Sequence, residues 1–358
     1  MLRVLLLSKY ERLGASSRLR SYQFLPFLES RGIEVSVAAL FSNDYVNSLC
    51  RGAVPIASVI WAYITRLAVM LRAKRFDVLW IEKEMFPWLP GWIERGLIPD
   101  NLSVVVDYDD AIFHRYDQHQ YSWVRALLGG KIDAVMRQTD LVIVGNDYLG
   151  DRARRAGARR VEWLPTVVDT TRYTAVAQAP RGPVTVGWIG TPSTAHYLHL
   201  VAPVLREIVA SKRGRVVAVG AEAEQLKDLH IEVRPWSEQT EVDEIQQFDI
   251  GIMPLPDELF ERGKCGYKLI QYMACGKPVV ASPVGVNRSL VHEGVEGFLP
   301  GNSSRWSAIL WALCDDPGLR NRLGAAGRRK VETGYSLEVA APRLEALLRS
   351  SVRTTCAA

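Results

Sequence analysis

Short apolar runs rich in valine, leucine and isoleucine alternate along the chain with stretches whose apolar residues recur at helical spacing. Continuous apolar runs of this kind are typical of strands in a parallel sheet that helices cover on both faces. In the first half, the runs lie at residues 4–7, 35–40, 78–81, 103–106, 141–144 and 161–164. In the second half, they lie at residues 184–189, 216–219, 231–233, 250–253, 278–281 and 297–299.

The pattern restarts after a stretch rich in alanine, glycine and proline at residues 173–183, which predicts a linker. A chain of 358 residues is long enough for two domains. We predict an α/β protein of two tandem Rossmann-like, doubly wound domains, residues 1–172 and 184–335. Residues 336–350 are expected to form a C-terminal helix that packs back on the first domain. Helices are predicted at about residues 17–30, 197–211, 268–274, 304–314 and 337–349.

Composition indicates the cellular compartment of the protein and argues against several classes of protein. The five cysteines form no CxxC pair, which argues against a disulfide framework or a structural zinc site. The apolar N-terminus is typical of a buried strand rather than a signal peptide, and no apolar stretch reaches the ~20 residues of a membrane span. We therefore expect a cytoplasmic protein. The net charge of +5 is mild and belongs to no nucleic-acid motif, so no nucleic acid is expected as a partner.

The excess positive charge is concentrated between residues 45 and 76, a segment without a single acidic residue. Within it, residues 57–71 place isoleucine, tryptophan and leucine at helical spacing, and Arg66, Arg72, Lys74 and Arg75 interrupt or follow them. A basic amphipathic helix with tryptophan can lie on an anionic membrane surface, so residues 57–75 are a candidate membrane contact. A buried connecting helix with a solvated end explains the same pattern, and the sequence leaves both interpretations open.

Candidate chemistry in the second half begins at residues 260–301. Lys264, Gly266 and Lys268 precede or open a predicted helix. Free N–H groups at a helix start favour anions, and two lysines would add charge for a phosphate or diphosphate. On charge alone, a solvated basic loop is an equally simple interpretation.

The stretch YMACGKPVVASPVG, which ends at Gly285, resembles the retaining glycosyltransferases of family 4. The resemblance continues in VEGF at residues 295–298 and in DIGIMPL at residues 249–255, and more weakly upstream at residues 14–20, 31–35 and 165–169. It implies the two-domain GT-B fold, with a ligand cleft between the domains. It also implies transfer of a sugar, with retention, from a nucleotide-diphosphate donor to a hydroxyl of a glycan or lipid-linked acceptor, without a metal or other cofactor.

Position and charge, together with this resemblance, suggest roles for residues of the second half, although residues 187–192 read GWIGTP where the family often has an arginine and a lysine for the diphosphate. The residues expected at the donor are Gly190, Thr191, Lys264, Gly266, Tyr267 and Gln271, and Lys268 is expected to offset charge on the leaving phosphate. Trp236 is a weaker candidate near the nucleobase.

The chain departs from the family where two glutamates separated by seven residues are usual. Gly263 and Gln271 stand at those places, with Glu261 two residues before the first. Gln271 could still hydrogen-bond a ribose hydroxyl. The departure keeps two alternatives open: a sugar-nucleotide epimerase of the same fold, and a catalytically inactive partner subunit.

In the first half, three carboxylates follow the run at residues 103–106: Asp107, Asp109 and Asp110. Asp109 and Asp110 are the candidates for orienting or deprotonating an acceptor hydroxyl, with His114 nearby. An acidic turn that caps the next helix is the alternative, and a metal-dependent transferase of the GT-A fold does not suit tandem parallel domains.

The loop after the first run supplies the remaining candidates. Gly14 and Arg18 would face the donor or acceptor, unless the loop only leads into a helix with Ser16 or Ser17 as its N-cap. Residues 82–84, Glu-Lys-Glu, are a weaker candidate on the acceptor side.

Overall fold

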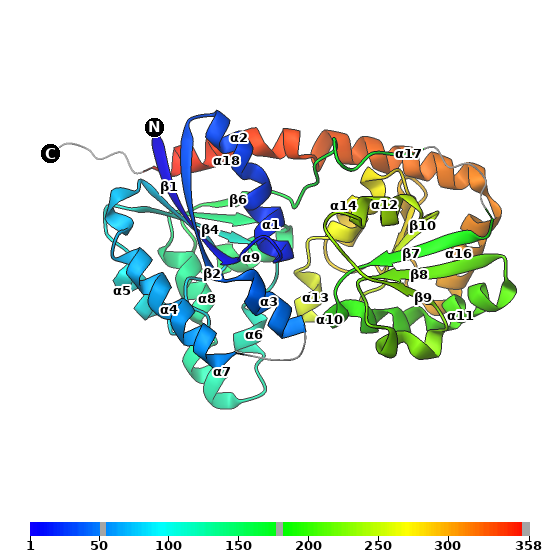
Figure 1. Ribbon diagram of the computed structural model, residues 1–358, viewed down its shortest axis with the longest axis horizontal. Coiled ribbons are helices and arrows are strands. Elements are labelled where there is room, and N and C mark those ends of the chain that lie inside the picture. Colours follow the sequence, from blue (N-terminus) through cyan, green and yellow to red (C-terminus); the bar gives the residue numbers. More distant parts are fainter. Residues whose placement is uncertain (51–54, 177–181, 353–358) are drawn as a thin grey trace. The chain divides into compact units, whose positions relative to one another are not determined.

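The computed structural model describes residues 1–50, 55–176 and 182–352, and its chain divides into two compact α/β units. The first comprises Met1–Thr166 together with the chain from Ala340, and the second comprises Val167–Val339. Each unit holds one six-stranded sheet with helices around it, and we describe each by itself (Figure 1).

The sheet of the first unit has the order β2-β1-β3-β4-β5-β6, and every strand pair is parallel. Its strands are β1 Leu2–Tyr10, β2 Ile33–Phe41, β3 Val78–Glu82, β4 Ser103–Tyr108, β5 Leu141–Val144 and β6 Val161–Trp163. Its helices are α1 Ala15–Arg20, α2 Leu25–Ser30, α3 Asn43–Cys50, α4 Ile56–Met70, α5 Gly91–Leu97, α6 His114–Asp117, α7 Ser122–Leu128, α8 Lys131–Gln138 and α9 Asp147–Arg155.

The sheet of the second unit has the order β12-β11-β10-β7-β8-β9 and is also parallel throughout. Its strands are β7 Val184–Ile189, β8 Gly214–Val219, β9 Glu232–Arg234, β10 Ile250–Met253, β11 Val279–Ala281 and β12 Gly297–Phe298. Its helices are α10 Pro192–Ala195, α11 Ala202–Ser211, α12 Glu241–Gln246, α13 Leu259–Arg262, α14 Tyr267–Ala274, α15 Asn287–Leu290, α16 Ser303–Asp315 and α17 Pro317–Gly334, and α18 Leu337–Ser351 follows. Each predicted apolar run forms a strand, so the predicted fold class is confirmed.

Two predicted helices are wrong as single elements, and a proline explains each break. Residues 17–30 form α1, a 3-10 turn at Tyr22–Phe24 and then α2, whose second residue is Pro26. Residues 197–211 form a 3-10 helix at His196–Val201 and then α11, whose second residue is Pro203. Proline has no N–H for the carbonyl four residues earlier and its ring clashes with that carbonyl, so it favours a first turn, although α18 also accommodates Pro342 in its interior.

The passage between the units begins before the linker that the sequence predicts. Val168 and Tyr173 are buried in the core of the second unit, and Val168 forms a parallel bridge with Ser336. Residues 167–173 therefore belong to the second unit, because their side chains complete its core. Of the predicted linker at 173–183, residues 177–181 lie outside the described part of the chain.

The C-terminal helix α18 begins in the second unit and belongs to the first unit from Ala340 onward. Its Arg343 and Arg349 donate hydrogen bonds to the carbonyls of Trp163 and Arg31, at 2.9 and 2.6 Å. In the described residues, no helix is both long enough and apolar enough to span a membrane.

Chain order reverses at one place in each sheet, and these switch points locate the candidate sites. In the first sheet the reversal lies between β1 and β3, and in the second between β7 and β10. Ligands of open parallel sheets bind beyond the carboxyl ends of strands at such a point. The loops that follow β1, β3 and β4, and those that follow β7 and β10, are therefore the ones to examine.

Candidate functional site

A buried ion pair joins the loops that follow β3 and β4 in the first unit. The Lys83 Nζ lies 2.8 Å from Asp109 Oδ1 and 3.9 Å from Asp110 Oδ2. Ser16, in α1, donates a hydrogen bond of 2.8 Å to the other oxygen of Asp109. Asp109 thus receives a cation and a hydroxyl from two elements, at the edge of the sheet where the sequence predicts the site.

This pairing decides the charge of both groups. Burial disfavours the ammonium form of Lys83, but Asp109 and Asp110 outweigh burial and raise the lysine pKa. Burial acts against the Asp109 carboxylate too, but Lys83 outweighs it and the pKa of Asp109 lies below its ordinary value. Near neutral pH, therefore, the edge holds an ionised carboxylate and an ammonium group in direct contact.

Lys83 owes its position to an uncommon backbone conformation. Its φ is 66°, in the left-handed region that residues other than glycine rarely adopt, and its N–H donates to the Asp107 carbonyl at 2.9 Å. Strain of this kind persists where the surroundings fix it and is concentrated at functional sites. Lys83 is only a weaker candidate from the sequence, because the pattern of residue types gives no sign of the backbone conformation.

Two arginines of the first unit are buried at this edge of the sheet. Asp107 is buried against Arg20, with a shortest N–O distance of 2.7 Å, and Arg20 also donates to the Leu164 carbonyl at 2.8 Å. Arg18 is buried and donates from its guanidinium to the Arg12 carbonyl at 3.2 Å, and its role toward a ligand stays a prediction. Both arginines hold loops together at the edge.

Gly14 is the N-cap of α1, and a Cβ there would lie 2.4 Å from the Cβ of Tyr10. The loop therefore folds closely on the end of β1. The expected N-caps Ser16 and Ser17 are wrong, since their hydroxyls donate to Asp109 and Glu82, the latter at 2.6 Å.

The acidic turn does not cap a helix. The helix α6 has Phe113 at its N-cap and no side-chain cap, so Asp109 and Asp110 are not used in that way. His114 lies within the same edge, with its ring nitrogens 2.8 Å from Asp117 Oδ1 and 2.8 Å from the Tyr148 hydroxyl.

In the second unit, Lys268 of α14 reaches the end of β7. Its Nζ lies 4.4 Å from the centroid of the Trp188 ring and donates to Thr194 Oγ1 at 3.3 Å. A Cβ on Gly190 would stand 2.7 Å from this nitrogen, so only glycine leaves room for it. Burial, with the nearby charge of Lys264, lowers the pKa of Lys268 to about 7.

Gly266 sets up the start of α14. It is the N-cap, with φ 66°, and a Cβ would lie 2.2 Å from Leu290 Cδ1. Lys264 precedes it, with its Nζ 5.0 Å from the centroid of the Phe260 ring. The structure therefore brings together Gly190, Thr191 and Lys268, with Lys264 near enough to act on the Lys268 charge.

Gln271 and Tyr267 belong to a polar network with three further residues, and this network was not predicted. The buried Gln271 donates from Nε2 to the Tyr173 hydroxyl at 2.9 Å, and that hydroxyl donates to Glu241 Oε1 at 2.7 Å. Trp236 donates to the other oxygen of Glu241 at 3.1 Å. The Tyr267 hydroxyl lies 3.3 Å from that of Tyr173. The amide nitrogen of Gln271 is thus engaged inside the unit.

A buried carboxylate also lies near the first of the two family glutamate positions. Glu261 is buried in α13 and accepts a hydrogen bond from the Tyr197 hydroxyl, while Gly263 ends the same turn. Tyr197, Tyr173 and Glu241 lie far from this segment in sequence, and only the folded chain shows that they meet it.

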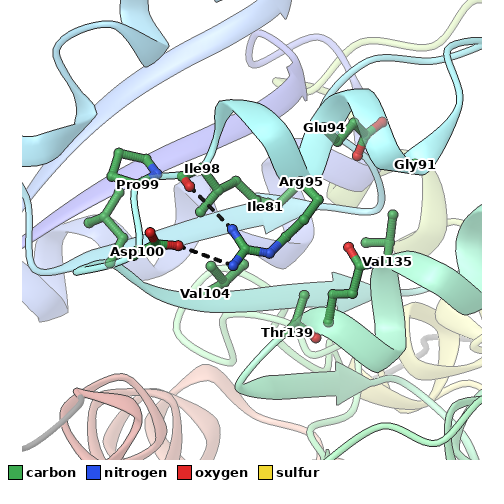
Figure 2. A pocket seen from close by; sticks show the side chains of 12 residues that line it. Ile81, Gly91, Glu94, Arg95, Ile98, Pro99, Asp100, Val104, Val135 and Thr139 are labelled. Carbon is green, nitrogen blue, oxygen red and sulfur yellow. Dashed lines mark hydrogen bonds and ion pairs between the residues drawn. The ribbon is translucent and has the colours of Figure 1, made fainter.

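A pocket in the first unit lies away from the candidate site, between α5, α8 and the strands β3 and β4. Figure 2 shows Arg95 at its centre, donating to Asp100 and to the Ile98 carbonyl at 3.2 and 3.3 Å. Asp100 and Thr139 precede β4 and β5, so this pocket lies at the opposite edge of the sheet from Asp109. It takes no part in the site built above.

Comparison with known families finds a match in the second unit. A sequence model of the family described as Glycosyl transferases group 1 matches residues 183–316. The matched stretch includes β7, α14 and the residues around Lys268. Residues 183–316 are therefore similar in sequence to this family.

Curated relatives match over a similar length. A D-inositol 3-phosphate glycosyltransferase of Thermobispora bispora is 37% identical over 95 residues, which is 26% of this chain and 21% of that protein. A GDP-mannose-dependent monoacylated alpha-(1-6)-phosphatidylinositol monomannoside mannosyltransferase of Corynebacterium glutamicum is 35% identical over 89 residues, 25% of this chain and 23% of that protein. The matched part spans about a fifth of the length of these relatives.

Solved structures resemble the chain over nearly its whole length. Sucrose-phosphate synthase of Thermosynechococcus elongatus has a TM-score of 0.71 at 15% identity and covers 98% of this chain and 99% of its own. WaaG, a glycosyltransferase involved in lipopolysaccharide biosynthesis, has 0.71 at 14%, covering 97% and 99%. Anabaena Alr3699/HepE in complex with UDP-glucose has 0.69 at 18%, covering 98% and 100%. The two-unit α/β architecture is thus that of GT-B glycosyltransferases.

Proposed function

We propose that the chain transfers a sugar, with retention of configuration, from a nucleotide-diphosphate donor to a hydroxyl of a glycan or lipid-linked acceptor. The observation that carries this proposal is the position of Lys268 against Gly190 at the end of β7, inside the matched domain. An ammonium group held at a switch point suits a phosphate group, and only glycine allows the approach.

The second unit binds the donor in this proposal. Gly190 and Thr191 offer backbone to the diphosphate, and Lys268 offsets the charge that develops on the leaving phosphate, with Lys264 adding positive potential. The pKa of Lys268 lies at about 7 without a ligand. A diphosphate beside it favours the charged form, so the donor itself completes the charge of the site. These lysines supply the charge that a metal ion would otherwise give, and the proposed reaction needs no metal or cofactor.

The first unit binds the acceptor. The Asp109 carboxylate is ionised and fixed by Lys83 and Ser16, so it can accept a hydrogen bond from an acceptor hydroxyl and orient it. Asp110 is the more open of the two carboxylates, at 3.9 Å from Lys83.

Donor binding is the direct test. UDP-glucose, GDP-mannose and the free nucleotides are added to the full chain, and the melting temperature is measured. A ligand at 100 times its Kd is expected to stabilise the fold by about 2.7 kcal/mol, which gives a shift of several degrees. A lack of any shift with the whole set would contradict the enzyme and favour an inactive partner subunit.

Product analysis separates transfer from epimerisation. Incubation of the donor without an acceptor is expected to give no isomer of the nucleotide sugar. An epimer formed under these conditions would replace the proposed transferase by an epimerase of the same fold. Turnover that persists in EDTA would support the metal-independent step, and turnover lost in EDTA and restored by a divalent cation would contradict it.

The proposal places the protein at the inner face of the cell membrane, with residues 57–75 against anionic lipid. The buried-helix interpretation of this segment is wrong, since Ile60, Trp61 and Ile64 are exposed on α4. Arg66 is not part of the basic surface, because it is buried and donates to the Ser8 carbonyl at 2.7 Å.

Reversing the exposed charges after α4 is expected to weaken membrane binding. The variant carries Arg72→Glu, Lys74→Glu and Arg75→Glu, and each basic residue near an anionic surface contributes about 1 kcal/mol. Sedimentation with vesicles of phosphatidylcholine and phosphatidylglycerol is expected to show binding weaker by more than tenfold. Equal binding of wild type and variant would refute a role for this segment.

A further inference from the structure

The exposed side of α4 is only one part of an apolar surface in the first unit. Trp61 is 69% exposed, and Ile60, Ile64 and Leu67 are exposed beside it. A surface helix of a water-soluble protein usually directs its large apolar side chains toward the core. Here the inner face is instead made by Tyr63, Arg66 and Met70, so the larger apolar side chains are left outward.

A second group of exposed apolar side chains lies in and before α5 and α7. Trp92 is 72% exposed and Trp123 is 64% exposed, and Trp88, Tyr121 and Leu127 are exposed with them. Within the described residues, every exposed tryptophan belongs to the first unit. The exposed large apolar residues described in the second unit are single aliphatic side chains. Isolated side chains of that kind are ordinary, whereas a concentration of aromatic ones marks an interaction site.

Ring contacts connect the two groups. Tyr63 of α4 donates to the Pro87 carbonyl, and its ring centroid lies 5.5 Å from that of Phe86. Trp88, which follows Pro87, has its ring centroid 5.7 Å from that of His119. The ring of His119 lies 5.4 Å from that of Tyr121, which stacks on Trp123 at 6.4 Å. Ring contacts thus link Tyr63 to Phe86 and Trp88 to Trp123, and the backbone of residues 86–88 joins the two sets.

The charge around this series has one sign. Residues 85–93 and 118–132 contain no aspartate or glutamate, as is also true of residues 45–76. Arg125 of α7 is exposed, as are the bases that follow α4. Residues 45–76 and 118–132 thus combine exposed aromatic or aliphatic side chains with basic ones, and residues 85–93 add exposed tryptophans and carry no charged residue.

We propose that α4, residues 86–92 and residues 119–127 form a single surface that binds the interface of an anionic lipid bilayer. Tryptophan and tyrosine rings settle at the headgroup level of bilayers, and basic side chains are attracted by anionic lipid. An acidic protein partner would explain the basic side chains, but it would not explain why four exposed tryptophans occur in three separate segments. The inference rests on the proposed function only in that a membrane-bound acceptor gives this surface a use.

The test removes aromatic side chains and leaves every charge in place. The double variant Trp92→Ala, Trp123→Ala is compared with wild type by sedimentation with vesicles of phosphatidylcholine and phosphatidylglycerol. Quenching of tryptophan fluorescence by brominated lipid is measured in parallel. We expect the double variant to bind at least tenfold more weakly and to lose most of the quenching. Trp163→Ala is the matched control, since Trp163 is exposed in the same unit but lies on β6 under Arg343.

Wild-type binding by the double variant, or equal loss by the control, would overturn the proposal. A wild-type dimer in solution that the double variant dissolves would also overturn it, because the surface would then serve a second copy. The melting-temperature shift with nucleotide is measured on the same variant and is expected to be unchanged. If nucleotide does not shift the melting temperature of the wild-type protein, only the proposed function is refuted, because vesicle binding is measured without donor.

Discussion

Replacing Lys268 with methionine is expected to lower kcat/KM by about 10²–10³-fold, the usual cost of removing one group that stabilises developing charge. Lys268 is the cation that the structure holds at the end of β7, with Nζ 4.4 Å from the Trp188 ring centroid. Methionine preserves most of the apolar stem that packs there. The loss of kcat/KM is therefore expected in a variant that still folds, and the melting temperature of Lys268→Met checks that it does.

The pH profile separates charge from packing at this position. Because the pKa of free Lys268 is about 7, kcat/KM is expected to fall as pH rises through that value. Lys268→Arg keeps its charge at every accessible pH, so its residual activity is expected to show no such limb. A limb near 7 that persists in the arginine variant would assign the titration to another group and remove Lys268 from the reaction.

As pH rises, the contribution of Lys268 to the stability of the fold is expected to increase while kcat/KM falls. The folded chain binds the Lys268 proton less tightly than the unfolded chain, whose lysine has a pKa near 10.5. Between pH 7 and 10.5 the unfolded state binds more protons, so stability from this residue rises with pH, and the penalty is full below pH 7. Lys268→Met is therefore expected to melt higher than wild type at pH 6.5, and the gain is expected to vanish above pH 10.5.

Asp109→Asn is expected to lower kcat by about 10²-fold with a small change in KM for the donor. Asparagine keeps the shape and can still accept from Ser16, but it loses the negative charge that faces Lys83 at 2.8 Å. The pKa of Asp109 lies below its ordinary value, so the wild-type carboxylate is charged through the neutral range. The ratio of the wild-type kcat to that of Asp109→Asn is thus expected to be independent of pH between 6 and 9.

Ser16→Ala is the matched control, because it removes a hydrogen bond from Asp109 and leaves the charge pair intact. It is expected to cost less than tenfold. If Asp109→Asn retained full kcat, the Asp109 carboxylate would have only a structural role, and the acceptor site would have to be sought elsewhere along the same edge.

The sheets could be predicted from the sequence, because a strand buried on both faces leaves a continuous apolar run. The runs at residues 141–144 and 184–189 coincide with β5 and β7 residue for residue. The breaks before Pro26 and Pro203 could also have been foreseen, since proline at those places prevents a continuous helix. The boundary at Thr166 could not, because it depends on Val168 joining a core whose members extend from Ile189 to Val331.

The candidate site was predicted in part. Asp109 and Lys268 stand out because each follows or opens an element at the expected edge of its sheet. A sequence does not show that Arg18 donates to the Arg12 carbonyl or that Gln271 donates to the Tyr173 hydroxyl, and the roles of both residues toward a ligand stay predictions. The partner of Asp109 is Lys83, whose left-handed backbone has no signature in residue type.

Gly190 also limits how such a site can change during evolution. A side chain there would collide with the Trp188 ring at 2.5 Å and with the Lys268 nitrogen at 2.7 Å. A larger residue at position 190 would therefore require the Trp188 ring to shift and the Lys268 ammonium group to withdraw. A change of donor preference is expected to begin at the exposed Thr191 rather than at Gly190.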